Sequence, residues 1–290
     1  MKVLKFGGSS LADAQRYLRV TEISMTIHQA NGAAVVLSAP KGVTNALGAL
    51  CEQAAGGEDY EVLFGELNDK VLGIAAELSE QVAGFDVATI NDFITTQLAG
   101  LKKQLQGIAL LGRSPDAVTA SIMSLGEYIS VNLFSGILSA KGISNQVLDP
   151  VEYVLAEGDY LDSIADVALS KANFSEVNTD GSQLIIMPGF VAANEKGEKV
   201  TLGRNGSDYS AAVLAACIDA ECCEIWTDVD GVYNADPNQV EGAVLLDKLT
   251  YQEAMELSYF GAKVLHPKTI GPIAQHHIPC LIKNTLNPSA

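Results

Sequence analysis

Short apolar runs alternate with helical patterns along most of this chain, and this alternation limits the folds that the chain can adopt. The run KVLKF at 2–6 ends at a pair of glycines, and a helical pattern follows to about residue 29. A second run at 33–39 leads through a turn into another helical pattern within 40–50. Strands joined by helical crossovers pair in parallel, since the helix returns the chain to the same end of the sheet. The pattern predicts an α/β fold with a mostly parallel sheet and helices on both faces.

The middle of the chain is mainly helical in pattern. Residues 58–112 carry leucine and valine at helical spacing, which predicts an antiparallel pair of helices. The stretch 115–142 predicts one apolar helix with Gly126 and Glu127 near its centre. Residues 150–183 show only weak patterns, which indicate loops and one short helix.

Strands and helices alternate again in the C-terminal part. The segment 184–203 predicts a β-hairpin whose turn is the polar sequence NEKGEK, and a helix should follow the sequence GRNGSD. The other expected elements are strands at 144–149, 223–228 and 279–283, and helices at 250–262 and from residue 267. The polar sequence NTDGSQ marks the expected boundary between two lobes near residue 180.

Charge and composition argue against several classes of protein. A net charge of −17 without a cluster of Lys or Arg opposes nucleic-acid binding. No apolar run approaches the roughly 18 residues of a membrane span, and the N-terminus lacks the apolar stretch of a signal peptide. The 5 cysteines contain no C-x-x-C pair and fit reduced thiols better than a disulfide framework. We therefore expect a cytoplasmic protein with no nucleic-acid or membrane partner.

Three turns that contain glycine, KFGGSS, PKGVTN and GRNGSD, each precede a helical pattern. A helix N-terminus presents unpaired N–H groups and the positive end of the helix dipole, so such turns can hold phosphate or carboxylate. In an open parallel sheet they gather at the carboxyl ends of the strands. The nucleotide signatures G-x-x-x-x-G-K-[ST] and G-x-G are missing, as are the hydrolase signatures H-E-x-x-H and G-x-S-x-G. The turns predict an anion site outside these standard classes.

Individual residues near the turns leave structural and functional interpretations open. Lys5 fits either a strand end in solvent or an anion-binding cation, and Ser9 fits a cap of the following helix. Asp208 can likewise cap the helix that follows GRNGSD. Glu127 lies in an apolar helical stretch, where a buried carboxylate needs a partner. The spacing of the aspartates in TDVDGVYNADP favours turns over a metal site.

Five motifs occur together along the chain, and their combination is specific. They are KFGGSS at 5–10, SLGEYIS at 124–130, GRNGSDYSA at 203–211, WTDVDGVYNADP at 226–237 and FGAKVLHP at 260–267. With these motifs the chain resembles the aspartate kinases of the amino-acid kinase superfamily. It is most similar to the kinase part of the bifunctional aspartokinase–homoserine dehydrogenases, and the resemblance covers essentially the whole chain.

The resemblance implies a reaction and a fold. The reaction is transfer of phosphate from ATP to L-aspartate, which gives ADP and 4-phospho-L-aspartate and begins the synthesis of lysine, threonine and methionine. The fold is a three-layer αβα sandwich with a mostly parallel central sheet. An N-terminal lobe, 1–180, would bind aspartate, and a C-terminal lobe, 181–290, would bind ATP.

The resemblance also assigns roles to residues of the motifs. Lys5 would stabilise the transferred phosphoryl group, and Asp208 would orient Lys5 and organise the cluster of Mg²⁺ and phosphate. Arg204 would pair with a carboxylate of aspartate, for which its planar guanidinium is suited. Glu127 would accept a hydrogen bond from the substrate ammonium. The surrounding hydroxyl donors would be Ser38, Thr44 and Ser207.

For ATP, the resemblance points to the glycine turn and to the C-terminal motifs. The residues implied are Gly7, Gly8, Ser9, Thr227, Asp228, Tyr233, Asp236 and Lys263, the last reaching the phosphates. Mg²⁺ would bind through ATP oxygens and water, without dedicated protein ligands. The chain departs from the family at Asn238, where arginine is common, so that ATP binding would depend more on Lys263.

A second departure concerns the C-terminus, because aspartate kinases normally continue beyond the sequence NTLNPSA. We expect the regulatory ACT domains and the dehydrogenase to be absent, and feedback inhibition by threonine or lysine to be absent or severely altered. A weak homodimer stays open. Two alternative functions also stay open, a kinase for another carboxylate such as acetylglutamate and a nucleotide-binding module without turnover. Glu127 and Arg204, which fit the aspartate pattern, weigh against the first, since an acetylated amine would not need a facing carboxylate. Lys5, Asp208 and Lys263 weigh against the second.

Overall fold

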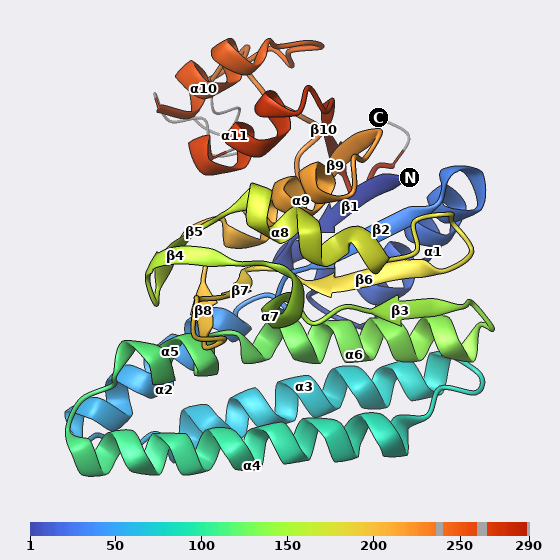
Figure 1. The fold of residues 1–290 in the computed structure, drawn as a ribbon. Coiled ribbons are helices and arrows are strands. Elements are labelled where there is room, and N and C mark those ends of the chain that lie inside the picture. The colour runs from blue at the N-terminus through green and yellow to red at the C-terminus, as the bar shows by residue number, and fades with distance from the viewer. Residues whose placement is uncertain (236–239, 260–265, 289–290) are drawn as a thin grey trace.

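The computed structural model describes residues 1–235, 240–259 and 266–288. Its centre is a six-stranded sheet in the order β10-β9-β1-β2-β6-β3, in which all neighbouring strands are parallel (Figure 1). The strands are β1 (Lys2–Phe6), β2 (Ala33–Leu37), β3 (Asn145–Val147), β6 (Leu184–Pro188), β9 (Cys222–Thr227) and β10 (Cys280–Asn284). The parallel sheet expected from the alternating pattern is thereby confirmed.

The strands β2 and β6 of the sheet are apolar on both faces. All residues of β2 and β6 are buried, as are the last four residues of β1. A strand covered by helices on both sides has no face for polar side chains, which explains the continuous apolar runs. Phe6 of β1 pairs with Leu37 of β2 and with Trp226 of β9, so these three strands end at one edge of the sheet.

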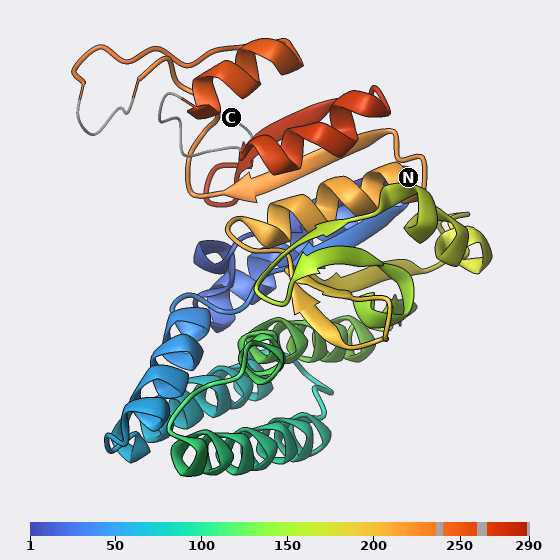
Figure 2. The ribbon, with the colours of Figure 1, turned by 60° about the vertical axis from the view of Figure 1, so that its left-hand side comes forward.

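One face of the sheet is covered by α1 (Ala14–Asn31) and α6 (Leu125–Ala140). The helices α2 (Val43–Gly56), α3 (Glu61–Gln81) and α4 (Val87–Leu111) pack against one another, and α3 and α4 lie beyond α6, away from the sheet (Figures 1 and 2). A continuous apolar core joins these helices to the sheet. The helical pair expected within 58–112 corresponds to α3 and α4.

The other face is covered by α9 (Gly206–Cys217), which contacts β1, β2 and β9 and is buried along its whole length. Beside it lie α8 (Val167–Asn173) and α11 (Pro267–Gln275), and α10 (Tyr251–Tyr259) packs on α11. The remaining elements are the hairpins β4 (Ala156–Asp159) with β5 (Asp162–Ala165) and β7 (Val191–Ala193) with β8 (Lys199–Thr201), the helix α7 (Pro150–Tyr153), and the 3-10 turns η1 (Gly8–Leu11) and η2 (Phe174–Glu176). Helices on both faces of the sheet make a three-layer αβα sandwich, as expected.

The single helix expected over 115–142 is wrong. The chain forms α5 (Asp116–Met123) and α6, which meet at Ser124. Gly126 and Glu127 therefore lie in the first turn of α6 rather than at the centre of a helix. A Cβ atom on Gly126 would lie 2.5 Å from the Cβ of Ala39, so this glycine lets the start of α6 approach the turn after β2.

Two further expectations need correction. The segment 184–188 is the strand β6 of the central sheet, and the hairpin comprises only 191–201. The stretch 150–183 holds the hairpin of β4 and β5 as well as α7 and α8. Periodicity missed these strands, because the exposed sequence AEGD of β4 has no apolar alternation.

No helix in the described part of the chain is long and apolar enough to cross a membrane. The division into lobes near residue 180 stays a prediction; β6, which follows that position, lies between β2 and β3.

Candidate active site

A cavity of about 600 Å³ opens at the carboxyl ends of β1 and β2 and at the N-terminus of α9. Its walls come from the three glycine-containing turns and from the start of α6, which are far apart in the sequence. Its lining includes the predicted residues Lys5, Gly8, Ser38, Thr44, Glu127, Arg204, Ser207 and Asp208. The fold therefore brings both predicted catalytic residues and all predicted aspartate-binding residues into one cavity.

Lys5 and Asp208 form an ion pair inside this cavity. The Nζ atom of Lys5 lies 2.6 Å from Oδ1 of Asp208, and the two side chains are only 11% and 10% exposed. Asp208 lies in the first turn of α9, which begins at Gly206, and its carboxylate faces β1. The alternative that Asp208 merely caps this helix is therefore wrong, because Asn205 is the N-cap residue and the helix has no side-chain cap.

The N-terminus of α9 points a helix dipole at the same cavity. Asn205 adopts a left-handed conformation with φ of 57°, and Asn205, Gly206 and Ser207 all line the cavity. A Cβ atom on Gly206 would lie 2.7 Å from the ring of Phe190, so only glycine lets the turn pack this closely. The positive end of the dipole favours an anion here.

Glu127 is a buried carboxylate in the first turn of α6, with 3% of its surface exposed. Burial raises its pKa to about 8, against the opposing effects of backbone N–H groups at Ala39 and Glu127 and of the charge on Lys5. Its Oε2 atom has no hydrogen-bond partner among the residues that the structure describes. A buried acceptor without a partner on a cavity wall is suited to a cationic donor from a ligand.

Other predicted binding groups surround this carboxylate. Arg204 is exposed and forms no ion pair within the described ranges. The hydroxyl groups of Ser38, Thr44 and Ser207 line the cavity and carry none of the hydrogen bonds found between described residues. The cavity thus offers one free guanidinium and three free hydroxyl donors.

The glycine turn after β1 lies next to the ion pair. A Cβ atom on Gly7 would lie 3.2 Å from Nζ of Lys5, which leaves space above the ammonium for a ligand. Gly8 lines the cavity, whereas Gly7 and Ser9 do not belong to its lining. The alternative that Ser9 caps α1 is wrong, because Asp13 accepts the hydrogen bond from the backbone N–H of Arg16 at 2.9 Å.

Of the predicted ATP residues, Thr227 is the last residue of β9, and Asp228 and Tyr233 follow it. All three lie outside the lining of the cavity. The backbone N–H of Gly7 donates to the carbonyl of Trp226 at 3.2 Å, so this end of β9 lies beside the glycine turn. The hydroxyl of Thr227 lies 3.2 Å from Oδ1 of Asp228. The predicted residues Asp236 and Lys263, and the departure at Asn238, lie outside the described residues.

Lys41 also lines the cavity, and the sequence interpretation did not assign it a role. Its side chain is exposed at the turn after β2, and its carbonyl accepts a hydrogen bond from Nζ of Lys70 at 2.7 Å. The signal was present in the sequence, since Lys41 lies within the glycine turn PKGVTN of an otherwise acidic chain.

Comparison with known proteins agrees with this geometry. Two bifunctional aspartokinase/homoserine dehydrogenases, from Buchnera aphidicola and Haemophilus influenzae, are 48% and 46% identical over 99% and 100% of this chain. The chain spans 35% and 36% of the length of those relatives. A crystal structure of E. coli aspartokinase III in complex with aspartate and ADP superimposes with a TM-score of 0.89 at 32% identity, covering 100% of this chain and 63% of that one. The model of the amino acid kinase family matches residues 1–284, and the chain belongs to that family.

Proposed function

We propose that this chain is an aspartate kinase that transfers the γ-phosphoryl group of ATP to the side-chain carboxylate of L-aspartate. The observation that carries the proposal is that a buried Lys5–Asp208 ion pair lines the same cavity as Glu127, a buried carboxylate whose Oε2 atom has no partner among the described residues. The names of the relatives support the same reaction, as does the aspartate and ADP in the solved structure of aspartokinase III.

In the proposed reaction, a carboxylate oxygen of aspartate attacks the γ-phosphorus, and the bond to the bridging oxygen of ADP breaks. The nucleophile is already ionised at neutral pH, so no general base is needed, and catalysis depends on positioning and charge stabilisation. Lys5 would stabilise the charge on the transferred group, and Asp208 would hold the ammonium in place. The N-terminus of α9 would add its dipole on the same side.

The substrate would be recognised by charge at both ends. Its ammonium would donate to Glu127, and this contact would favour the ionised form of that carboxylate. Its α-carboxylate would pair with Arg204 in the bidentate geometry that guanidinium favours. Ser38, Thr44 and Ser207 would donate hydrogen bonds to the remaining oxygens, which fits their position in the lining.

ATP would approach from the side of β9, over the glycine turn. Gly7, Gly8 and Ser9 would lie against the phosphates, and Thr227, Asp228 and Tyr233 against the nucleoside. Asp236 and Lys263 are the other two residues that we propose to bind ATP.

The proposed site offers few protein carboxylates as ligands for Mg²⁺. Within the described part of the chain, the carboxylates that line the cavity are Glu127 and Asp208, and Asp208 is paired with Lys5. ATP oxygens and water would therefore hold most of its coordination sites, with Asp208 beside them. When bound, the ion supplies positive charge that neutralises the phosphates.

The test measures ADP release from MgATP with L-aspartate, L-glutamate or N-acetyl-L-glutamate. Hydroxylamine would trap an acyl phosphate as a hydroxamate and separate transfer from simple hydrolysis. Aspartate-dependent ADP release with matching hydroxamate is expected. ADP release that is the same without any amino acid would refute the proposal.

A further inference from the structure

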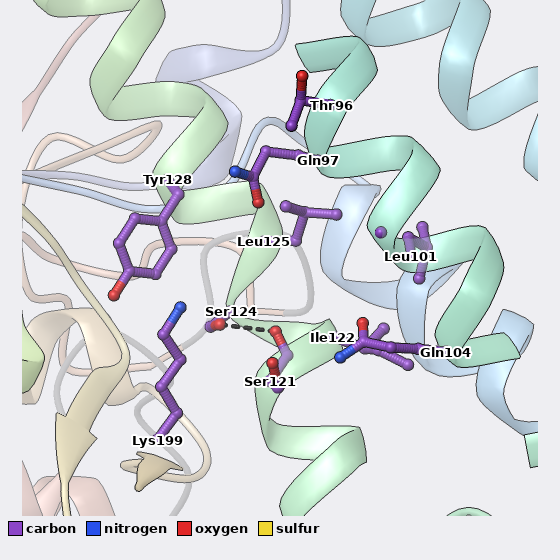
Figure 3. Close-up of a pocket in the computed structure, with 11 residues that line it drawn as sticks. Thr96, Gln97, Leu101, Gln104, Ser121, Ile122, Ser124, Leu125, Tyr128 and Lys199 are labelled. Carbon is purple, nitrogen blue, oxygen red and sulfur yellow. Dashed lines mark hydrogen bonds between the residues drawn. The ribbon is translucent and has the colours of Figure 1, made fainter. Parts of the chain in front are cut away.

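A second cavity, of about 330 Å³, lies between α4, the junction of α5 and α6, and strand β8 (Figure 3). We call it the Lys199 cavity, and the side chains that define it are Gln97 and Gln104 of α4, Ser121 of α5, Ser124 and Tyr128 near the start of α6, and Lys199 of β8. None of these residues lines the 600 Å³ cavity that holds Lys5, Glu127 and Asp208, which we call the active-site cavity.

Lys199 is a half-buried cation without an ionic partner. Its Nζ atom lies 4.0 Å from the centroid of the Tyr128 ring, and it forms no ion pair with a described residue. The nearby carboxylate of Asp149 already accepts hydrogen bonds from the hydroxyl of Tyr128 at 2.6 Å and from the backbone N–H of Val151 at 3.1 Å. Burial lowers the pKa of Lys199, although the charge of Asp149 opposes this effect. The ammonium is thus poorly compensated by the protein.

Neutral hydrogen-bonding groups line the same cavity as this cation. Gln97 and Gln104 extend from α4 toward α5 and α6, and both side chains are half-buried (Figure 3). Neither amide takes part in the hydrogen bonds between described residues. The hydroxyl of Ser124 donates to the carbonyl of Ser121 at 2.8 Å and is already satisfied. Among the described residues, the free donors of the cavity are the ammonium of Lys199, the two amides, and the hydroxyl groups of Thr96 and Ser121.

We propose that the Lys199 cavity binds a small oxyanion, carried by the carboxylate or phosphate group of a metabolite. An oxyanion would accept from the ammonium and from both amides, and each such bond is strengthened by charge. The volume lies at the lower end of the range of about 300–1,000 Å³ for small-molecule pockets. The Lys199 cavity and the active-site cavity share no lining residue, so an anion could bind in the former even if the proposed reaction were wrong.

The position of the Lys199 cavity couples it to the active site. Ser124 and Tyr128 flank Glu127 in the first turns of α6, and Lys199 lies two residues from Thr201, which lines the active-site cavity. An occupant would therefore bias the placement of the same turn that carries Glu127. By linkage, substrate in one cavity would change affinity in the other by an equal factor.

The test uses the 290-residue chain with its lysines reductively methylated with ¹³C, and follows the Lys199 signal during separate titrations with acetate and inorganic phosphate. The signal is assigned by its loss in Lys199→Arg and Lys199→Met. A saturable shift with acetate indicates a carboxylate ligand, and one with phosphate indicates a phosphorylated ligand. The absence of a saturable shift with both would overturn the proposal.

Matched variants locate the site. Lys196→Met removes an exposed lysine from the turn of the same hairpin and should leave the titration of Lys199 unchanged. Gln104→Leu keeps the cation and should weaken binding at least tenfold; unchanged affinity would show that the anion binds elsewhere. Arg204→Ala should leave the Lys199 titration intact, whereas loss of the shift in this variant would assign the anion to the active site.

Discussion

Three ionisable side chains are nearly buried together at the active site, and each is costly to keep there. Lys5 and Asp208 compensate one another, whereas Glu127 remains without a partner on its Oε2 atom. Breaking a buried pair typically costs about 3–5 kcal/mol, because one charge is left uncompensated. Buried charged groups of this kind fit a binding site in which the bound ligands supply the missing ionic and hydrogen-bond partners.

Lys5→Met should lower kcat by about a hundredfold or more, since it removes a charge that stabilises the transferred phosphoryl group. It should also destabilise the fold, because Asp208 would remain buried and unpaired. The double variant with Asp208→Asn should regain stability but not activity, as measured by denaturant unfolding and ADP release. Lys171→Met is the control, because its pair with Asp219 is exposed and should be worth at most about 1 kcal/mol. Equal losses of stability in the two single lysine variants would contradict this account.

Glu127 should make stability depend on pH. Its pKa is raised from 4.5 to about 8, so between these values the folded chain keeps a proton that the unfolded chain has lost. The free energy of unfolding should therefore fall as pH rises from about 4.5 to 8 and contribute no further slope above that. Glu127→Gln should flatten this part of the profile, whereas Glu77→Gln, on the exposed face of α3, should follow the unmodified protein. A profile that is unchanged by Glu127→Gln would show that the carboxyl is not buried.

At the scale of elements, the junction of α5 and α6 positions the turn that carries Glu127. It breaks a long apolar stretch so that the first turn of α6 faces the turn after β2. The same junction forms walls of both the active-site cavity and the Lys199 cavity. Small shifts of this turn should therefore affect substrate binding more than similar shifts elsewhere in the helical layer.

Gly126→Ala tests this junction. The added Cβ would lie 2.5 Å from the Cβ of Ala39 and 2.9 Å from Cγ1 of Val43, so α6 must move, at a cost of about 1–3 kcal/mol. The displaced Glu127 should raise the KM for aspartate. Gly73→Ala within α3 meets no atom within 4 Å and should instead stabilise the fold by about 1 kcal/mol. Thermal unfolding and steady-state kinetics would measure both effects; a neutral Gly126→Ala would refute the close approach.

At the scale of the whole molecule, the net charge of −17 opposes compaction. Raising ionic strength from about 0.01 M to 0.15 M shortens the screening length from about 30 Å to about 8 Å. We expect Tm to rise by a few degrees over this range, to the same extent with sodium and potassium chloride. A Tm that stays constant or falls would mean that local ion pairs outweigh the global repulsion.

Local periodicity was sufficient to predict the parallel sheet and the three glycine turns. The strand β2 is a continuous apolar run, and β1 and β2 each end at a glycine turn that leads into a helix. The carboxyl ends of parallel strands share one edge of the sheet, so the glycine turns were expected to lie together. The resemblance to aspartate kinases, and not the periodicity, assigned Lys5 and Asp208 to a common site.

The tertiary structure alone decided three other features. It placed the segment 184–188 in the central sheet, broke the helix at Ser124, and put Lys199 opposite Tyr128. Each depends on packing between segments distant in sequence: a short apolar strand fits either a hairpin or a sheet, and the clash that Gly126 avoids is with Ala39. The sequence by itself determined the layers and the residue types that line the main cavity. Only the folded chain determined which side chains lack a partner, because that depends on every neighbour at once.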